Sequence, residues 1–76
     1  MNAERRKRIT ELADRLESIK AELETLRDEE QEYFDNMPEA FQNGDKGEKA
    51  QGAIDALESA ESDIDGALEY LETAQE

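Results

Sequence analysis

The sequence lacks three residue types on which the chemistry of many small proteins depends. Its 76 residues include no cysteine, no histidine and no tryptophan. Without cysteine, neither a disulfide nor a thiolate zinc site can form, and without histidine the commonest metal ligand and general base is missing. No apolar run approaches the ~20 residues of a membrane span. The basic N-terminal residues precede no apolar stretch, so we expect no secretory signal and a cytoplasmic location.

Catalysis is not expected either. The sequence suggests no pairing of a nucleophile with a base, and a two-helix chain offers no enclosed apolar pocket. Acidic clusters such as Glu29, Glu30, Glu32 and Asp35 follow neither EF-hand nor Glu-x-x-His spacing, so a solvated acidic face is the better interpretation. We therefore predict a protein that is not an enzyme and that uses no cofactor or metal.

Short length and high charge constrain the fold. Charged residues make up 41% of the chain, aromatic residues 5%, and the net charge is −13. This balance suits a long exposed helix or a coiled coil, and it also borders on that of disordered chains. A single domain this small has a thin core, and oligomerisation is a common way to stabilise it. A homodimer is therefore expected if the chain folds.

A heptad pattern favours folding over disorder. One heptad position holds Ile9, Leu16, Leu23 and Met37, and the other holds Leu12, Ile19, Leu26 and Tyr33. Only Glu30 interrupts the pattern, and several consecutive heptads indicate a coiled-coil helix. No glycine or proline occurs between Ala3 and Asn36, so the first helix is predicted over about residues 4–35.

The chain then turns and begins a second helix. Pro38 disfavours continuation of the helix, and residues 38–42 are predicted to form one short turn within a loop at 36–46. Gly44 can take a left-handed conformation at little cost, and Asp45 with Glu48 resembles a capping box. The second helix is predicted over about residues 47–73. Its apolar positions are Ala53, Ala60, Ala67 and Ala74 in one line and Leu57, Ile64 and Leu71 in another, widened by Ile54 and Leu68.

These features predict an all-α fold in which residues 1–76 form one antiparallel two-helix hairpin. In the expected register, facing residues have numbers that add to about 83, so that Leu12, Ile19 and Leu26 face Leu71, Ile64 and Leu57. Dimerisation into a four-helix bundle would then bury the flank that includes Ile54, Leu68, Ala13 and Ala21.

Charge supports an antiparallel arrangement. Residues 1–8 have a net charge of +3, whereas residues 50–76 hold eight acids and no Lys or Arg. The two clusters would compensate each other in a hairpin. The acidic residues, with Asp63, Asp65 and Glu69 as candidates, also allow a second function: a nucleic-acid mimic that occupies the basic groove of a host nucleic-acid-binding protein. A simpler interpretation is that the negative charge serves only to keep the protein soluble.

Large apolar residues gather around the turn. Tyr33, Phe34, Met37 and Phe41 include three of the four Phe and Tyr residues. They would either close the end of the hairpin or anchor a partner protein, since aromatic residues and Met are enriched at interface centres. These four are the candidate partner-binding residues beside the three acids. Direct binding to nucleic acid or membrane is not expected, because the overall charge opposes it.

The middle of the chain resembles a recurrent type of sequence. Residues 28–39 read DEEQEYFDNMPE and are followed by Phe41-Gln42 and Gly47-Glu48. This segment is similar to small acidic proteins of phage and bacterial genomes with a DEEQE-x-FDNMPE-type middle. The resemblance covers about residues 20–72 and implies a helix–loop–helix protein, in the host cytoplasm if phage-encoded, with no catalytic residue. By analogy it implies three roles: a self-associating protein-interaction module, an acidic inhibitor of host defence, or a virion structural or assembly component.

Overall fold

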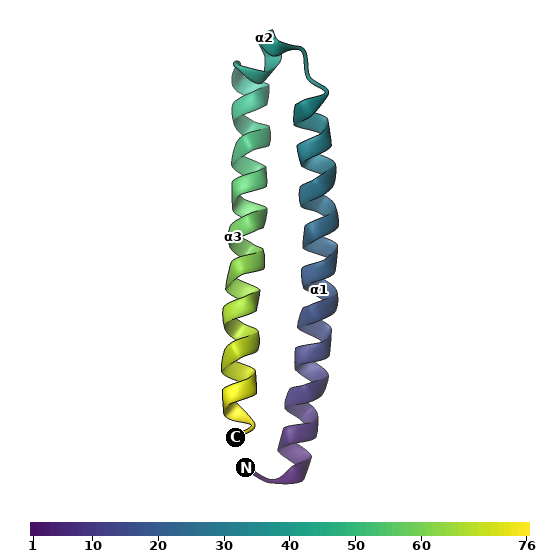
Figure 1. Ribbon diagram of the computed structural model, residues 1–76, viewed down its shortest axis with the longest axis vertical. Helices are drawn as coiled ribbons and strands as arrows, with labels where there is room; N and C mark the ends of the chain where they lie inside the picture. Colours follow the sequence, from purple (N-terminus) through teal and green to yellow (C-terminus); the bar gives the residue numbers. More distant parts are fainter.

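The chain folds into a long antiparallel helical hairpin. The computed structural model describes all 76 residues, and its helices are α1 (Ala3–Asp35), α2 (Glu39–Gln42) and α3 (Asp45–Ala74). α1 and α3 run side by side, α2 lies at the closed end, and the two termini meet at the other end (Figure 1). The Cα atoms span 58 × 15 × 11 Å. The predicted all-α hairpin is therefore confirmed. No helix has the length and apolar character that crossing a membrane requires.

The helix ends follow from local hydrogen bonding. Asn2 precedes α1, and its side chain accepts a 2.8 Å hydrogen bond from the backbone N–H of Arg5, which satisfies one of the free donors at the helix start. Pro38 precedes α2 in an extended conformation, as its missing N–H and fixed φ favour. The short turn predicted for residues 38–42 thus corresponds to α2.

The start of α3 differs from the prediction. Gly44 is extended, with φ −104° and ψ −167°, and is not left-handed. Asp45 is already the first residue of α3 and no side chain caps this end, so the predicted capping box does not form. The physical reason is that α2 has already reversed the chain, and the carbonyl of Gly44 accepts the first bond of α3 from the N–H of Glu48 directly.

The residues that form the contact between α1 and α3 differ in part from those that the heptad pattern predicted. Along α1, the residues turned toward α3 and at least half-buried have the spacing of a heptad: Ile9, Ala13, Leu16, Lys20, Leu23, Arg27, Glu30 and Phe34. Along α3 the corresponding residues are Ala50, Ile54, Leu57, Glu61, Ile64, Leu68, Leu71 and Gln75. Each helix therefore contributes one line of mainly apolar residues and a second line that contains charged or polar ones.

The prediction is wrong for one of the two heptad positions of α1. Leu12, Ile19, Leu26 and Tyr33 were expected in the contact, yet they are 45–52% exposed. The adjacent residues Lys20 and Arg27 lie in the contact in their place. Ile54, predicted on an outer flank, is 1% exposed and belongs to the core. Both helices are rotated so that ion pairs close one side of the hairpin, which leaves the large apolar line of α1 on the other side.

The register is close to the expected one. The polar contacts between the helices join Lys20 to Asp65, Thr10 to Gln75 and Arg27 to Glu61. Their residue numbers add to 85, 85 and 88, compared with the expected value of about 83. These long side chains reach obliquely across the contact. The alignment of the two helices along their axes is therefore nearly the predicted one.

The closed end depends on a close approach of two backbones. Gly47 is buried in the first turn of α3, and a Cβ atom placed there would overlap the backbone carbonyl of Gln42 at the end of α2. The side-chain amide of Gln42 also donates a 3.0 Å hydrogen bond to the carbonyl of Phe34. Gln42 thus ties the turn to α1, and Gly47 lets α3 begin directly against it.

We expect Gly47→Ala to lower the free energy of unfolding by about 2 kcal/mol or more, because the added methyl overlaps backbone that cannot move independently. Gly52→Ala and Gly66→Ala are matched controls, since a Cβ at either position meets nothing within 4 Å. Each control should instead stabilise the hairpin by about 1 kcal/mol. Urea unfolding followed by circular dichroism measures all three, and equal effects at positions 47 and 52 would contradict the prediction.

Candidate functional site: an open apolar groove

Ion pairs close one side of the hairpin. Arg27 Nη1 donates to Glu61 Oε2 at 2.6 Å, and Lys20 Nζ lies 2.6 Å from Asp65 Oδ1. Arg27 also contacts Asp28 at 3.3 Å on its own helix. All three acids pair with bases on α1, and two of the three pairs join α1 to α3. This side of the hairpin is therefore polar and already occupied.

The Arg27–Glu61 pair is the more buried of the two cross-helix pairs. The Glu61 side chain is 9% exposed, whereas that of Asp65 is 54% exposed. Only one oxygen of Glu61 is paired, since Oε1 is buried without a hydrogen-bond partner. A carboxylate in this position depends on its single cation, because an unpaired buried charge is costly.

Both bases keep their charge over the whole physiological range. The hydrogen bond to Asp65 raises the pKa of Lys20. Burial opposes the charged form of Arg27, but the hydrogen bond to Asp28 and the charge of Glu61 still raise its pKa. A raised pKa means that the Lys20 pair contributes stability at neutral pH and loses it only when the pH rises above the ordinary lysine value of 10.5.

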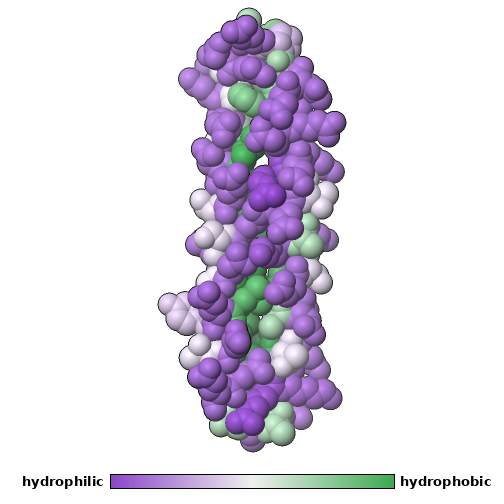
Figure 2. Space-filling view, viewed as in Figure 1, coloured by the Kyte–Doolittle hydropathy of each residue, from purple (hydrophilic) through white to green (hydrophobic).

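The opposite side of the hairpin is open and apolar. A groove of about 480 Å³ lies there between α1 and α3, and six of its seven lining residues are hydrophobic. They are Leu12, Leu16, Ile19, Ala67, Tyr70 and Leu71, with Arg15 at the edge. The face drawn in Figure 2 is largely hydrophilic, with apolar surface in narrow strips between the helices.

The groove continues a longer apolar line along α1, which we call the apolar stripe: Leu12, Ile19, Leu26 and Tyr33. Its members are seven residues apart and therefore lie on one side of the helix. Across from the stripe, α3 presents small residues at the same spacing, Ala53, Ala60 and Ala67, which are half-buried. Large side chains on one helix and alanines on the other leave room between them. The hairpin thus has a concave face that a further helix can fill.

The predicted tip residues do not act as one cluster. Phe34 and Met37 are half-buried at the closed end, while Tyr33 and Phe41 are each 52% exposed. Tyr33 ends the apolar stripe, and Phe41 lies in α2 with Lys46 Nζ 5.5 Å from its ring centroid. Closing the hairpin is therefore the role of Phe34 and Met37, and exposed apolar surface remains at Tyr33 and Phe41.

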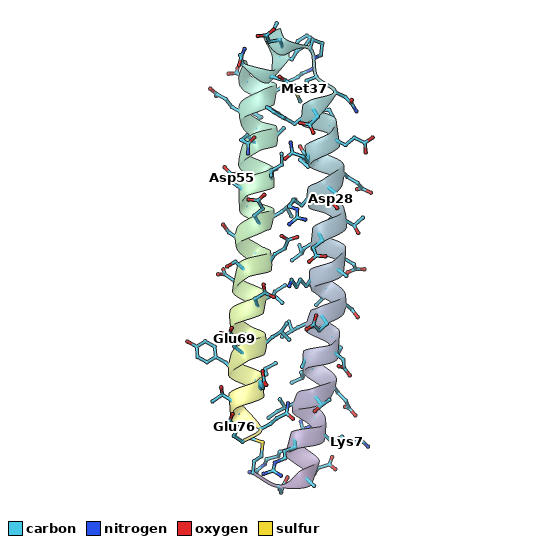
Figure 3. The ribbon with its side chains drawn as sticks, viewed as in Figure 1. Lys7, Asp28, Met37, Asp55, Glu69 and Glu76 are labelled. Atoms are coloured by element: carbon cyan, nitrogen blue, oxygen red, sulfur yellow. The ribbon has the colours of Figure 1, made fainter.

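The predicted acidic residues lie on α3, where Asp63, Asp65 and Glu69 are all exposed. Asp65 is engaged by Lys20, whereas Asp63 and Glu69 make no ion pair. Lys7 and Glu76 lie at the same end of the hairpin, opposite the end that holds Met37 (Figure 3). The basic N-terminal cluster is therefore near the acidic end of α3, although no ion pair within 4 Å joins them. No group of three or more acidic residues is arranged to hold a metal ion.

Sequence reasoning missed the charged contact residues. Lys20 and Arg27 directly follow Ile19 and Leu26, so they occupy a heptad position of their own, seven residues apart. Glu61 lies seven residues after Ile54 on α3. The partners of the two bases, Glu61 and Asp65, lie four residues apart on α3. Bases on one helix and acids at the corresponding level of the other, next to the apolar positions, are a signal that was present in the sequence.

We expect Arg27→Met to lower the melting temperature by roughly 5 °C or more, because the buried carboxylate of Glu61 loses its only partner. Lys20→Met is the matched control and should have less than half this effect, since Asp65 stays hydrated. Thermal unfolding by circular dichroism measures both. Arg27→Met combined with Glu61→Leu should recover most of the loss, and a double variant that is less stable than either single one would contradict this account.

The comparisons with known proteins supply no relative. No protein-family model, curated protein or solved structure matches this chain significantly. The resemblance of residues 28–42 to small acidic phage and bacterial proteins therefore stays a prediction from sequence. The geometry that bears on function is a hairpin with one side closed by ion pairs and the other side open along an apolar groove.

Proposed function

We propose that this chain is a small acidic protein-interaction module of phage or bacterial type that self-associates through its open apolar groove and binds a further protein. The observation that supports this most directly is the apolar stripe, four large side chains left 45–52% exposed on one side of α1. Soluble monomers rarely expose such a continuous apolar line, and those that do generally use it as an interface. The chain has no catalytic function under this proposal.

The thin core points in the same direction. Ala50 and Ile54 are the only buried hydrophobic residues of the hairpin. A chain of this size needs additional burial to be stable, and neither a disulfide nor a metal supplies it. Two hairpins that meet groove to groove would form a four-helix bundle. In such a bundle Leu12, Ile19, Leu26 and Tyr33 would be buried, rather than the flank with Ile54 and Leu68 that the sequence had suggested.

We expect Leu26→Ala to weaken dimerisation roughly 30- to 100-fold, since each dimer loses two buried leucine side chains at about 1 kcal/mol or more each. The monomer should be little affected, because Leu26 is 50% exposed in it. Phe41→Ala is the matched control, as Phe41 is equally exposed but lies in α2, away from the groove. A concentration series by sedimentation equilibrium measures the dissociation constant. A wild-type chain that stays monomeric well above micromolar concentration would refute the proposal.

A second candidate function rests on the surface of α3. Beyond Lys49 the chain has no base, and of the eight acids that follow only Glu61 and Asp65 are paired. The remaining carboxylates form an exposed negative surface along the outer part of the helix. Such a surface suits the basic groove of a nucleic-acid-binding protein, which would make the chain an acidic inhibitor.

We expect Asp63→Lys with Glu69→Lys to abolish most low-salt binding to a basic nucleic-acid-binding protein, because the pair of reversals removes negative charge without breaking an ion pair. Asp65 is left unchanged, since it holds Lys20. Pull-down from a bacterial lysate at low and high salt, with mass spectrometry, tests the wild type and the variant side by side. If a protein is captured equally at low and high salt and by both the wild type and the variant, nucleic-acid mimicry is excluded. Apolar contacts at Tyr33 and Phe41 would then be favoured. Recovery with capsid or tail proteins would favour a virion component.

A further inference from the structure

We infer that α1 of a second copy fills the space beside the apolar stripe, antiparallel to the first α1, so that the two turns lie at opposite ends of the dimer. This inference rests on the proposed self-association and adds its geometry. It follows from the charges beside the stripe, which favour one orientation of the partner copy over the others.

The stripe matches itself when it is reversed. Its four members are evenly spaced, with the midpoint between Ile19 and Leu26. An antiparallel copy of α1 centred on this midpoint places Leu12 beside the partner's Tyr33 and Ile19 beside the partner's Leu26. All four large residues then find a partner. Spacing alone also permits a parallel copy, so the choice between them depends on charge.

A line of four charged residues flanks the stripe on the side away from α3. We call it the charged flank: Arg8, Arg15, Glu22 and Glu29. Each member precedes a stripe residue by four positions and is therefore its neighbour on the helix surface. Arg8 and Arg15 share a surface hollow with Leu12, and Glu22 shares one with Leu26.

The charged flank is free to meet a partner. All four side chains are exposed, and none takes part in an ion pair within the chain. The first half of the flank is basic and the second half is acidic. Within the hairpin these charges form no ion pair, whereas an antiparallel copy of α1 can pair Arg15 with the partner's Glu29.

The alternatives bring like charges together. A parallel pair of α1 helices would place Arg8 and Arg15 beside their own copies, and Glu22 and Glu29 likewise. Charges of one sign at facing positions select against such an arrangement. An antiparallel pair centred between Ile19 and Leu26 instead places Arg15 of each copy beside the partner's Glu29. It forms these two opposite-charge contacts at the cost of one like-charge contact, between Glu22 and its own copy at the centre.

Packing α1 on the partner's α3 is also disfavoured. On the groove side, α3 carries Lys49, Ala56, Asp63 and Tyr70 at seven-residue spacing, with Tyr70 in the groove itself. The contact of Lys20 with Asp65 sets the level of the two helices, and by the same register Glu22 is level with Asp63. If both turns lay at the same end, Glu22 would meet the partner's Asp63. The two acidic turn regions would also be brought together.

A distance measurement between single labels tests the orientation. The chain has no cysteine, so Lys7→Cys and Ala21→Cys each introduce one site for a spin label, both exposed and away from the stripe and the flank. In the inferred dimer the two labels at position 7 should be roughly 45 Å apart, from a rise of 1.5 Å per residue on each side of the midpoint. Labels at position 21 should be within about 25 Å, since they lie near the centre of adjacent helices.

The outcomes separate the inference from the proposed function. A short distance at position 21 with a long one at position 7 supports the antiparallel pair. Short distances at both positions show a dimer whose turns lie at one end, which overturns the inference and leaves self-association intact. No dipolar coupling at either position, with a monomer in sedimentation, overturns both.

A charge exchange provides an independent check. Arg15→Glu should raise the dimer dissociation constant about tenfold, and adding Glu29→Arg should return it to near the wild-type value. Restoration by the second change requires that positions 15 and 29 face each other across the interface. A double variant as weak as Arg15→Glu alone would overturn the inferred pairing.

Discussion

The ion pair between Arg27 and Glu61 determines which side of each helix faces the other. Its carboxylate is almost fully buried and has one cation within reach, so α1 and α3 cannot rotate without exposing or isolating that charge. Lys20 and Asp65 reinforce the same rotation. Leu12, Ile19, Leu26 and Tyr33 are thereby left on the outside, although hydrophobicity alone would place them between the helices. The open groove is a consequence of satisfying a buried charge.

This constraint explains why the sequence indicated the hairpin but not its interface. Helix formers, a heptad pattern interrupted only at Glu30, and Pro38 are local signals, and they are sufficient for two helices and a turn. Whether Leu12 or Ala13, and Ile19 or Lys20, lies in the contact depends on the side chains that α3 places opposite them. A periodicity argument assigns the larger apolar residue to the contact, because it does not count the cost of leaving Glu61 unpaired.

The same reasoning applies to the candidate functional residues. Tyr33 and Phe41 were recognisable as large apolar groups near a turn, and both are exposed in the folded chain. Phe34 and Met37 have the same character in sequence, yet they close the end of the hairpin. The difference arises from the helical phase of α1 and from the hydrogen bond of Gln42 to the carbonyl of Phe34. Arg8, Arg15, Glu22 and Glu29 became informative only once the stripe beside them was known to be exposed.

The distribution of burial along α3 has a consequence for how the molecule moves. Three of its four buried residues, Gly47, Ala50 and Ile54, lie in the half nearest the turn, and the fourth, Glu61, lies just past the middle. From Glu61 to the C-terminal end, where the groove lies, no further residue is buried. Local opening in a protein is easiest where few side chains are buried. The helices should therefore separate from the terminal end inward while the turn end holds, so that the groove we propose as an interface is also the part of the molecule that adapts its shape most readily.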